Sequence, residues 1–168
     1  MIKTVFVALL LFLYACSNTS SGNSAGTGGG NQAKTAPAFT LDAYPSGQIS
    51  LSDYSGKVVF LNFVGYSCPP CIASAPATQS EIADKYDPSV LQVLGLDVWD
   101  GTTGQVANFK IQTGVTYTVL MKASRVGAAY NAVNDYSVLV DKKGQIVYSE
   151  YGINISALRE KIDQLIKE

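Results

Sequence analysis

Apolar runs alternate with amphipathic segments along most of this 168-residue chain. Residues 58–64 are apolar on both faces except at Asn62, as expected for a central parallel strand. Residues 155–168 instead repeat apolar side chains at helical spacing, with charges opposite, which predicts an amphipathic helix. Further strands are expected at residues 38–41, 48–51, 90–98, 117–121, 136–140 and 145–151. Further helices are expected at residues 70–85, kinked by Pro76, and at residues 102–112 and 124–130.

The order of these elements predicts an α/β domain over residues 36–168. A strand-helix-strand unit is followed by an inserted helix and strand, and then by two strands and a final helix. Residues 141–144 read Asp-Lys-Lys-Gly, a hairpin signal between the last two strands. We therefore expect a central mixed β-sheet flanked by helices, preceded by an N-terminal β-hairpin. Chemistry on such a sheet usually lies outside the carboxyl ends of its strands.

The N-terminal residues have the pattern of a processing segment followed by a tether. Residues 1–15 carry Lys3 and a short apolar run, and they end in Leu-Tyr-Ala before Cys16, which resembles the cleavage box of a bacterial lipoprotein. We expect cleavage before Cys16 and lipid on its sulfur; the alternative is an ordinary signal peptide with a stray cysteine. Residues 16–35 are rich in Ser, Asn, Gly and Thr and predict a flexible tether. The predicted location is extracytoplasmic and membrane-anchored, facing the periplasm in a cell with two membranes.

Composition excludes several classes of function. The net charge of −1 gives no indication of a nucleic-acid surface. The chain has no histidine, which excludes a Cys-His or Ser-His catalytic pair and any metal site that needs imidazole. Its three cysteines, Cys16, Cys68 and Cys71, are too few for a disulfide scaffold.

Cys68 and Cys71 flank Pro69 and Pro70 at a predicted strand-to-helix junction. The partial positive charge of a helix N-terminus favours a thiolate over a thiol at Cys68. Cys71 follows one helical turn later, close enough to form an intramolecular disulfide with it. Such a pair can exchange two electrons with a partner dithiol through a mixed disulfide.

Residues 37–63, the Cys-Pro-Pro-Cys motif with Pro76, and hairpin residues 139–146 together resemble the TlpA/ResA-like family, in the AhpC/TSA-Redoxin branch of the thioredoxin superfamily. The resemblance implies a thioredoxin-like fold and a membrane-anchored, extracytoplasmic thiol-disulfide oxidoreductase. It makes Cys68 the attacking thiol and Cys71 the resolving one, with no cofactor beyond their disulfide. Expected partners are extracytoplasmic protein disulfides or dithiols and a membrane thiol reductant or oxidant. Reduction of protein disulfides by a monomer is the default expectation.

The sequence departs from the family pattern around the cysteines. Ser67 stands where the family usually has Trp, and Ser74 where many members have Glu. Asn62 replaces the buried Asp of thioredoxins proper. Asp135, six residues before Asp141, occupies the position of the cis-proline that faces the disulfide in the family.

These departures leave several alternatives open. Asp135 either lies beside the sulfurs, where it would raise the pKa of Cys68 and accept a proton, or is a solvated loop residue. Tyr66 is a candidate for the substrate surface in place of the missing Trp. Trp99 either lines the edge of the active site or packs locally, with Asp100 helping to start the helix that follows it.

Two other functions compete with disulfide exchange. A peroxidase of the peroxiredoxin type would need Thr three residues before its cysteine, where this chain has Gly65, and a supporting arginine, for which only Arg125 and Arg159 are available. A Cu(I) chaperone of the Sco type would use the two cysteines as soft ligands, but the family's distant histidine is missing.

Overall fold

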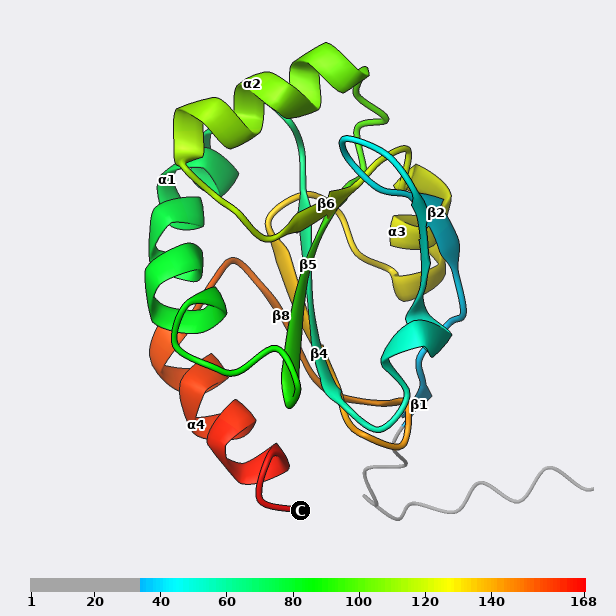
Figure 1. Ribbon diagram of the computed structural model, residues 1–168, viewed down its shortest axis with the longest axis vertical. Helices are drawn as coiled ribbons and strands as arrows, with labels where there is room; N and C mark the ends of the chain where they lie inside the picture. Colours follow the sequence, from blue (N-terminus) through cyan, green and yellow to red (C-terminus); the bar gives the residue numbers. More distant parts are fainter. Residues whose placement is uncertain (1–33) are drawn as a thin grey trace, which may run out of the picture. The chain divides into compact units, whose positions relative to one another are not determined.

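The computed structural model describes residues 34–168 (Figure 1). The predicted signal segment, the lipidation site at Cys16 and most of the predicted tether lie outside the described residues. Lys34 and Thr35, which we expected in the tether, instead form strand β1 (Lys34–Thr35) and pair with strand β8 (Gln145–Tyr151). No helix within residues 34–168 is both long enough and apolar enough to cross a bilayer.

The centre of the fold is a six-stranded mixed sheet in the order β1-β8-β7-β4-β5-β6. Its remaining strands are β4 (Val58–Val64), β5 (Leu91–Asp97), β6 (Thr118–Leu120) and β7 (Tyr136–Val140). β4 pairs with β5 in parallel and with β7 in antiparallel orientation, and β5 pairs with β6 in parallel. The carboxyl ends of β4 and β5 and the beginning of β7 therefore meet at one edge of the sheet.

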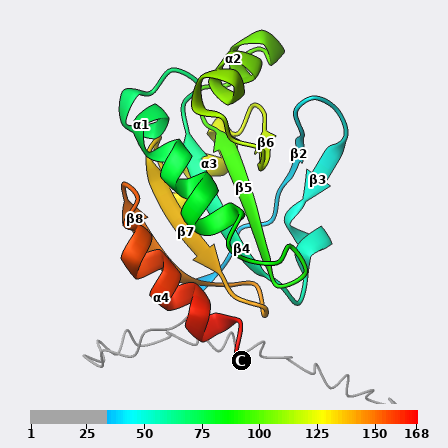
Figure 2. The same cartoon turned by 60° about the vertical axis from the view of Figure 1, so that its left-hand side comes forward.

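The helices and a separate hairpin cover the two faces of this sheet (Figures 1 and 2). The helices are α1 (Pro69–Thr78), α2 (Thr103–Thr113), α3 (Ser124–Tyr130) and α4 (Ile155–Leu165). The hairpin consists of β2 (Thr40–Asp42) and β3 (Gln48–Ser50), followed by the 3-10 turn η1 (Leu51–Tyr54). Figure 2 shows α1 and α4 lying across one face of the sheet, while α3 and the hairpin lie on the other side.

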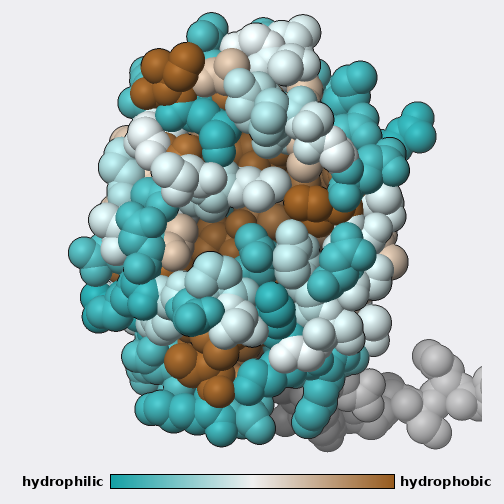
Figure 3. Space-filling model, viewed as in Figure 1, coloured by the Kyte–Doolittle hydropathy of each residue, from teal (hydrophilic) through white to brown (hydrophobic). Residues whose placement is uncertain are grey.

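Successive side chains of β4 point to opposite faces of the sheet and so pack into two separate hydrophobic cores. Phe60 points into the core under α1, α2 and α4, and Phe63 points into the core that α3 and the hairpin close. Both side chains are fully buried, and burial of each stabilises the fold by roughly 1.5–3 kcal/mol. On the face seen in Figure 3, exposed apolar surface is divided into patches among polar side chains. The predicted fold class is therefore confirmed.

The helix after the cysteine motif is shorter than predicted. α1 ends at Thr78 and continues as the π-helical turn η2 (Gln79–Ala83), whereas the sequence predicted one helix over residues 70–85. Pro76 has no N–H to donate within α1, and the chain widens into the π turn three residues later.

Asp100 was expected to help start the helix that follows it, α2, and this expectation is wrong. Thr102 caps α2, whereas Asp100 accepts hydrogen bonds from the backbone N–H and the hydroxyl of Ser124 at the start of α3.

Candidate active site

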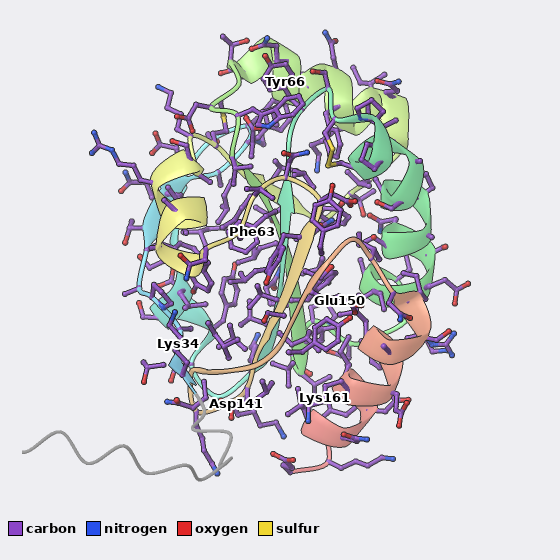
Figure 4. All side chains as sticks on the ribbon, turned by 180° about the vertical axis from the view of Figure 1, so that it is seen from behind. Lys34, Phe63, Tyr66, Asp141, Glu150 and Lys161 are labelled. Atoms are coloured by element: carbon purple, nitrogen blue, oxygen red, sulfur yellow. A yellow bond between two sulfur atoms is a disulfide. The ribbon has the colours of Figure 1, made fainter. Side chains whose placement is uncertain are left out.

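A disulfide joins Cys68 and Cys71 at the carboxyl edge of the sheet, with 5.3 Å between their Cα atoms (Figure 4). Cys68 is the N-cap of α1, and Pro69 and Pro70 begin the helix, where proline's missing N–H costs nothing. The Sγ of Cys68 accepts a hydrogen bond from the backbone N–H of Cys71 at 3.3 Å. The predicted position at a helix N-terminus is confirmed. Both cysteines are almost fully buried, at 0% and 1% exposure.

Near its disulfide end, the central sheet contains buried polar groups. Asn62 pairs with Gly95 of β5 and Ser137 of β7, and it is 1% exposed. Its Oδ1 and the hydroxyl of Tyr117 have no hydrogen-bond partner among the described residues. Burial raises the pKa of Tyr117. A Cβ on Gly95 would lie 3.2 Å from the Tyr117 ring, so the glycine makes room for the tyrosine.

Tyr66 and Trp99 form an aromatic pair beside the cysteine motif. Their rings meet edge to face with centroids 5.8 Å apart, and Trp99 remains 43% exposed. Each ring lies against a glycine: a Cβ on Gly65 would come within 2.4 Å of the indole, and one on Gly101 within 2.6 Å of the Tyr66 ring. Figure 4 places Tyr66 at the same end of the molecule as the disulfide. The local-packing alternative for Trp99 is therefore confirmed, while its place at the edge of the active site stays a prediction.

Asp97, which sequence reasoning missed, organises the turn that presents Trp99. The Asp97 carboxylate is buried at the end of β5 and accepts hydrogen bonds from the backbone N–H groups of Gly101 at 2.6 Å and Trp99 at 3.2 Å. Burial raises the pKa of Asp97, and these N–H donors partly offset the rise. Its signal in the sequence was a carboxylate at the end of an otherwise apolar strand.

The loop between α3 and β7 brings Asn134, rather than Asp135, into contact with sulfur. The Nδ2 of Asn134 donates a hydrogen bond to the Sγ of Cys68 at 3.3 Å. Asp135 is buried with a left-handed φ of 58°, and its carbonyl accepts a hydrogen bond from the N–H of Gly152 at 2.6 Å. Burial raises the pKa of Asp135. The solvated-loop alternative is therefore wrong, while its action on the thiol stays a prediction.

Ser67 and Ser74, which stand where the family usually has Trp and Glu, have different surroundings. Ser67 is exposed directly before Cys68. Ser74 turns back along α1, and its hydroxyl donates a hydrogen bond to the carbonyl of Cys71 at 3.3 Å.

Gly65 stands at the position where a peroxidase would need threonine. It lies too close to Trp99 to accept a side chain unless the indole moves. Among residues 34–168 there is no cluster of three or more His, Cys, Asp or Glu side chains suited to a metal ion.

Comparison with known proteins supports assigning this chain to the thiol-disulfide oxidoreductases. Residues 33–156 match the AhpC/TSA family. The thiol-disulfide oxidoreductase ResA of Bacillus thuringiensis is 30% identical over 137 residues, which cover 80% of this chain and 76% of that protein. ResA of Bacillus subtilis is 28% identical over 139 residues, covering 82% and 76%.

Solved structures share the fold. The solution structure of a candidate protein disulfide isomerase from Bacteroides thetaiotaomicron has a TM-score of 0.73 at 29% identity, covering 81% of this chain and 90% of that one. The crystal structure of a candidate thiol:disulfide interchange protein DsbE from Chlorobium tepidum has a TM-score of 0.71 at 27% identity, covering 80% and 96%.

Fold and site together define an enzyme of the thioredoxin-like class, a thiol-disulfide oxidoreductase whose electrons are carried by a disulfide rather than by a bound cofactor. The chain belongs to the AhpC/TSA family, and within it resembles the ResA-like proteins.

Proposed function

We propose that this protein reduces disulfides of extracytoplasmic proteins through Cys68 and Cys71, while a lipid on Cys16 holds it at the membrane. The observation that carries the chemical part is the disulfide at the N-terminus of α1, with Cys68 as the cap. The lipoprotein-like segment before Cys16 supports the location. The names of the ResA relatives support exchange between thiols and disulfides.

The exchange balances as two successive displacements. The Cys68 thiolate attacks one sulfur of the partner disulfide, so that a mixed disulfide forms and the other partner sulfur leaves as a thiolate. The Cys71 thiolate then attacks the Sγ of Cys68, which releases the second partner thiolate and forms the Cys68–Cys71 disulfide. Two electrons pass to the partner, whose thiolates take protons according to the pH. A membrane dithiol reduces the pair again by the same steps in reverse.

Partner docking would use the Tyr66–Trp99 pair, which we assign as part of the contact surface. The pair presents partly exposed aromatic area close to the cysteine motif, and its rings pack directly against Gly65 and Gly101. Because Cys68 is fully buried in the disulfide form, a partner must also displace covering groups to reach its sulfur. Ser67, exposed next to Cys68, lies on the route of approach.

Serine variants of the two cysteines test this function. With the purified full chain, we expect Cys68→Ser to abolish dithiol-dependent reduction of insulin, with Ser149→Ala, an exposed position on β8, retaining the wild-type rate. In cells, Cys71→Ser should accumulate mixed disulfides through Cys68, recovered in the membrane fraction and joined to extracytoplasmic proteins. Equal insulin reduction by Cys68→Ser, or trapping of cytoplasmic proteins only, would overturn the proposal.

The direction of electron flow is tested by equilibrating the protein with glutathione. A reductant should have a potential near that of thioredoxin, about −270 mV, whereas a value near that of DsbA, about −120 mV, would indicate an oxidant and contradict the proposed direction.

A further inference from the structure

The loop between α3 and β7 places a neutral amide on the sulfur of Cys68. The Nδ2 of Asn134 and the backbone N–H of Cys71 both lie 3.3 Å from this Sγ and donate hydrogen bonds to it. Asn134 is half-buried and Cys68 is fully buried, so the contact is shielded from water. A shielded hydrogen bond to a charged sulfur is stronger than one made in water.

Backbone hydrogen bonds on both sides of Asn134 hold the loop that orients its side chain. Asn131 and Asp135 have left-handed φ values of 53° and 58°, a conformation that Asn and Asp adopt more readily than other non-glycine residues. The N–H of Gly152 binds the Asp135 carbonyl at 2.6 Å, and the N–H of Ala132 binds the carbonyl of Gly127 at 2.8 Å. The loop therefore presents one side chain to the sulfur instead of sampling many orientations.

The segments next to the cysteine motif carry no cation that could stabilise a thiolate. The segments that surround the cysteine motif, residues 65–68, 98–102 and 131–135, contain no lysine or arginine, and neither does α1. Their titratable groups are Tyr66, Asp100 and Asp135, with Asp97 at the end of β5. Ionised carboxylates at these positions would disfavour a thiolate. The groups that can stabilise a charged Cys68 are therefore the N-terminus of α1, the thiol of Cys71 and the amide of Asn134.

We propose that Asn134 is a catalytic residue that stabilises the thiolate of Cys68 by donating a hydrogen bond to its Sγ. This inference rests on the proposed function, in which Cys68 is the attacking thiol. A disulfide sulfur is a weak acceptor, whereas a thiolate makes a charge-assisted bond, so the contact strengthens when the pair is reduced. Asn134 therefore lowers the pKa of the Cys68 thiol and shifts the pair toward its reduced form.

Two variants of Asn134 test this role. Asn134→Ala removes the donor, and the nearly isosteric Asn134→Asp keeps the coverage of the sulfur but replaces the donor with a carboxylate. We expect Asn134→Ala to move the pH midpoint of Cys68 alkylation upward by about one unit, and Asn134→Asp by more. The measurement uses the reduced full chain, with mass spectrometry of the peptide that contains Cys68. Val133→Ala, in the same loop at a 58% exposed position, is the matched control and should leave the midpoint unchanged.

The equilibrium with glutathione gives a second readout, taken at a pH where Cys68 is ionised. Asn134→Ala should be up to tenfold harder to reduce, a shift of about 30 mV toward more negative potentials. Midpoints equal to wild type in both variants would overturn the role of Asn134, even if insulin reduction continues. Failure of the wild-type chain to exchange with protein disulfides would instead overturn the proposed function, while the alkylation midpoints still decide the role of the amide.

Discussion

Two connections of β7, one at each end of the central sheet, are held by different means. At the β7–β8 turn, the carboxylate of Asp141 accepts hydrogen bonds from the backbone N–H groups of Lys143 and Gln145, and Gly144 takes the left-handed φ of 77°. At the disulfide end, Asp135 takes such a φ without being glycine. One turn is satisfied within five residues, whereas the other is held by partners far away in the sequence.

This difference shows where the fold stores conformational cost. A left-handed backbone costs a non-glycine residue roughly 1–2 kcal/mol, less for Asn and Asp, and such residues persist when tertiary contacts over-determine them. Asp100, Lys122 and Asp135, all left-handed, lie beside the strand ends that surround the disulfide. The opposite end uses glycine at Gly56 and Gly144, and Gly152 at the disulfide end is left-handed as well. The left-handed residues other than glycine that flank strand ends therefore gather at the end that carries the chemistry.

The largest test of this comparison is Gly65→Ala at the disulfide end. The new Cβ would lie 2.4 Å from the Trp99 ring, so the indole must move. Overpacking of this kind costs about 1–3 kcal/mol, and it should also slow insulin reduction several-fold by disrupting the aromatic surface. The free energy of unfolding from urea titration and the tryptophan fluorescence spectrum measure the change.

Gly104→Ala in α2 is the matched control, because a Cβ there meets nothing within 4 Å. It should be neutral or stabilise the protein by a few tenths of a kcal/mol up to about 1 kcal/mol, since alanine is the better helix former. Equal stability and equal insulin reduction for Gly65→Ala and Gly104→Ala would show that the contact with Trp99 is unimportant.

A smaller effect is expected at the opposite end, from Gly144→Ala. Forcing alanine to the φ of 77° should lower the free energy of unfolding by about 1 kcal/mol, because the Cβ of an L residue disfavours the left-handed conformation. The rate of insulin reduction and the Cys68 alkylation midpoint should stay at wild-type values. A changed midpoint would break the comparison, since it would couple the two ends of the sheet.

The smallest expected effect is the pH dependence removed by Asp135→Asn. Burial holds the pKa of Asp135 above its unfolded value of about 4, so this group's contribution to stability is full below that pH and is lost as the pH rises through the folded pKa. Urea titrations from pH 3.5 to 7 should therefore show a flatter decline for the variant. A constant difference from wild type across this range would contradict the assignment.

The same variant decides whether Asp135 acts on the thiol. An ionised carboxylate near Cys68 disfavours the thiolate, so Asp135→Asn should lower the alkylation midpoint of Cys68. An unmoved midpoint would leave Asn134 as the loop residue that controls the sulfur, and Asp135 as a residue that fixes the loop.

Much of this site was predictable because it depends on neighbours in the sequence. The strand before Cys68 and the helix after it follow from the apolar run and from two prolines at the helix start. The β7–β8 turn follows from Asp141 and Gly144. Asn134 was not predicted, although its neighbour Asp135 was, because φ values on both sides of a loop residue decide which side chain turns inward. Asp97 was missed although its hydrogen bonds are local, to the N–H groups of residues two and four positions later, because its burial at the end of β5 is a property of the fold.

The sequence by itself determined the redox pair, the α/β fold and the order of its elements, because a Cys-x-x-Cys at a strand-to-helix junction and apolar periodicity are local patterns. Tertiary structure alone decided what surrounds the sulfur. The contact between Asn134 and Cys68 spans 66 positions, and the packing of Trp99 on Gly65 joins the ends of two different strands. Such contacts depend on strand pairing and loop strain, which no single segment of the chain encodes.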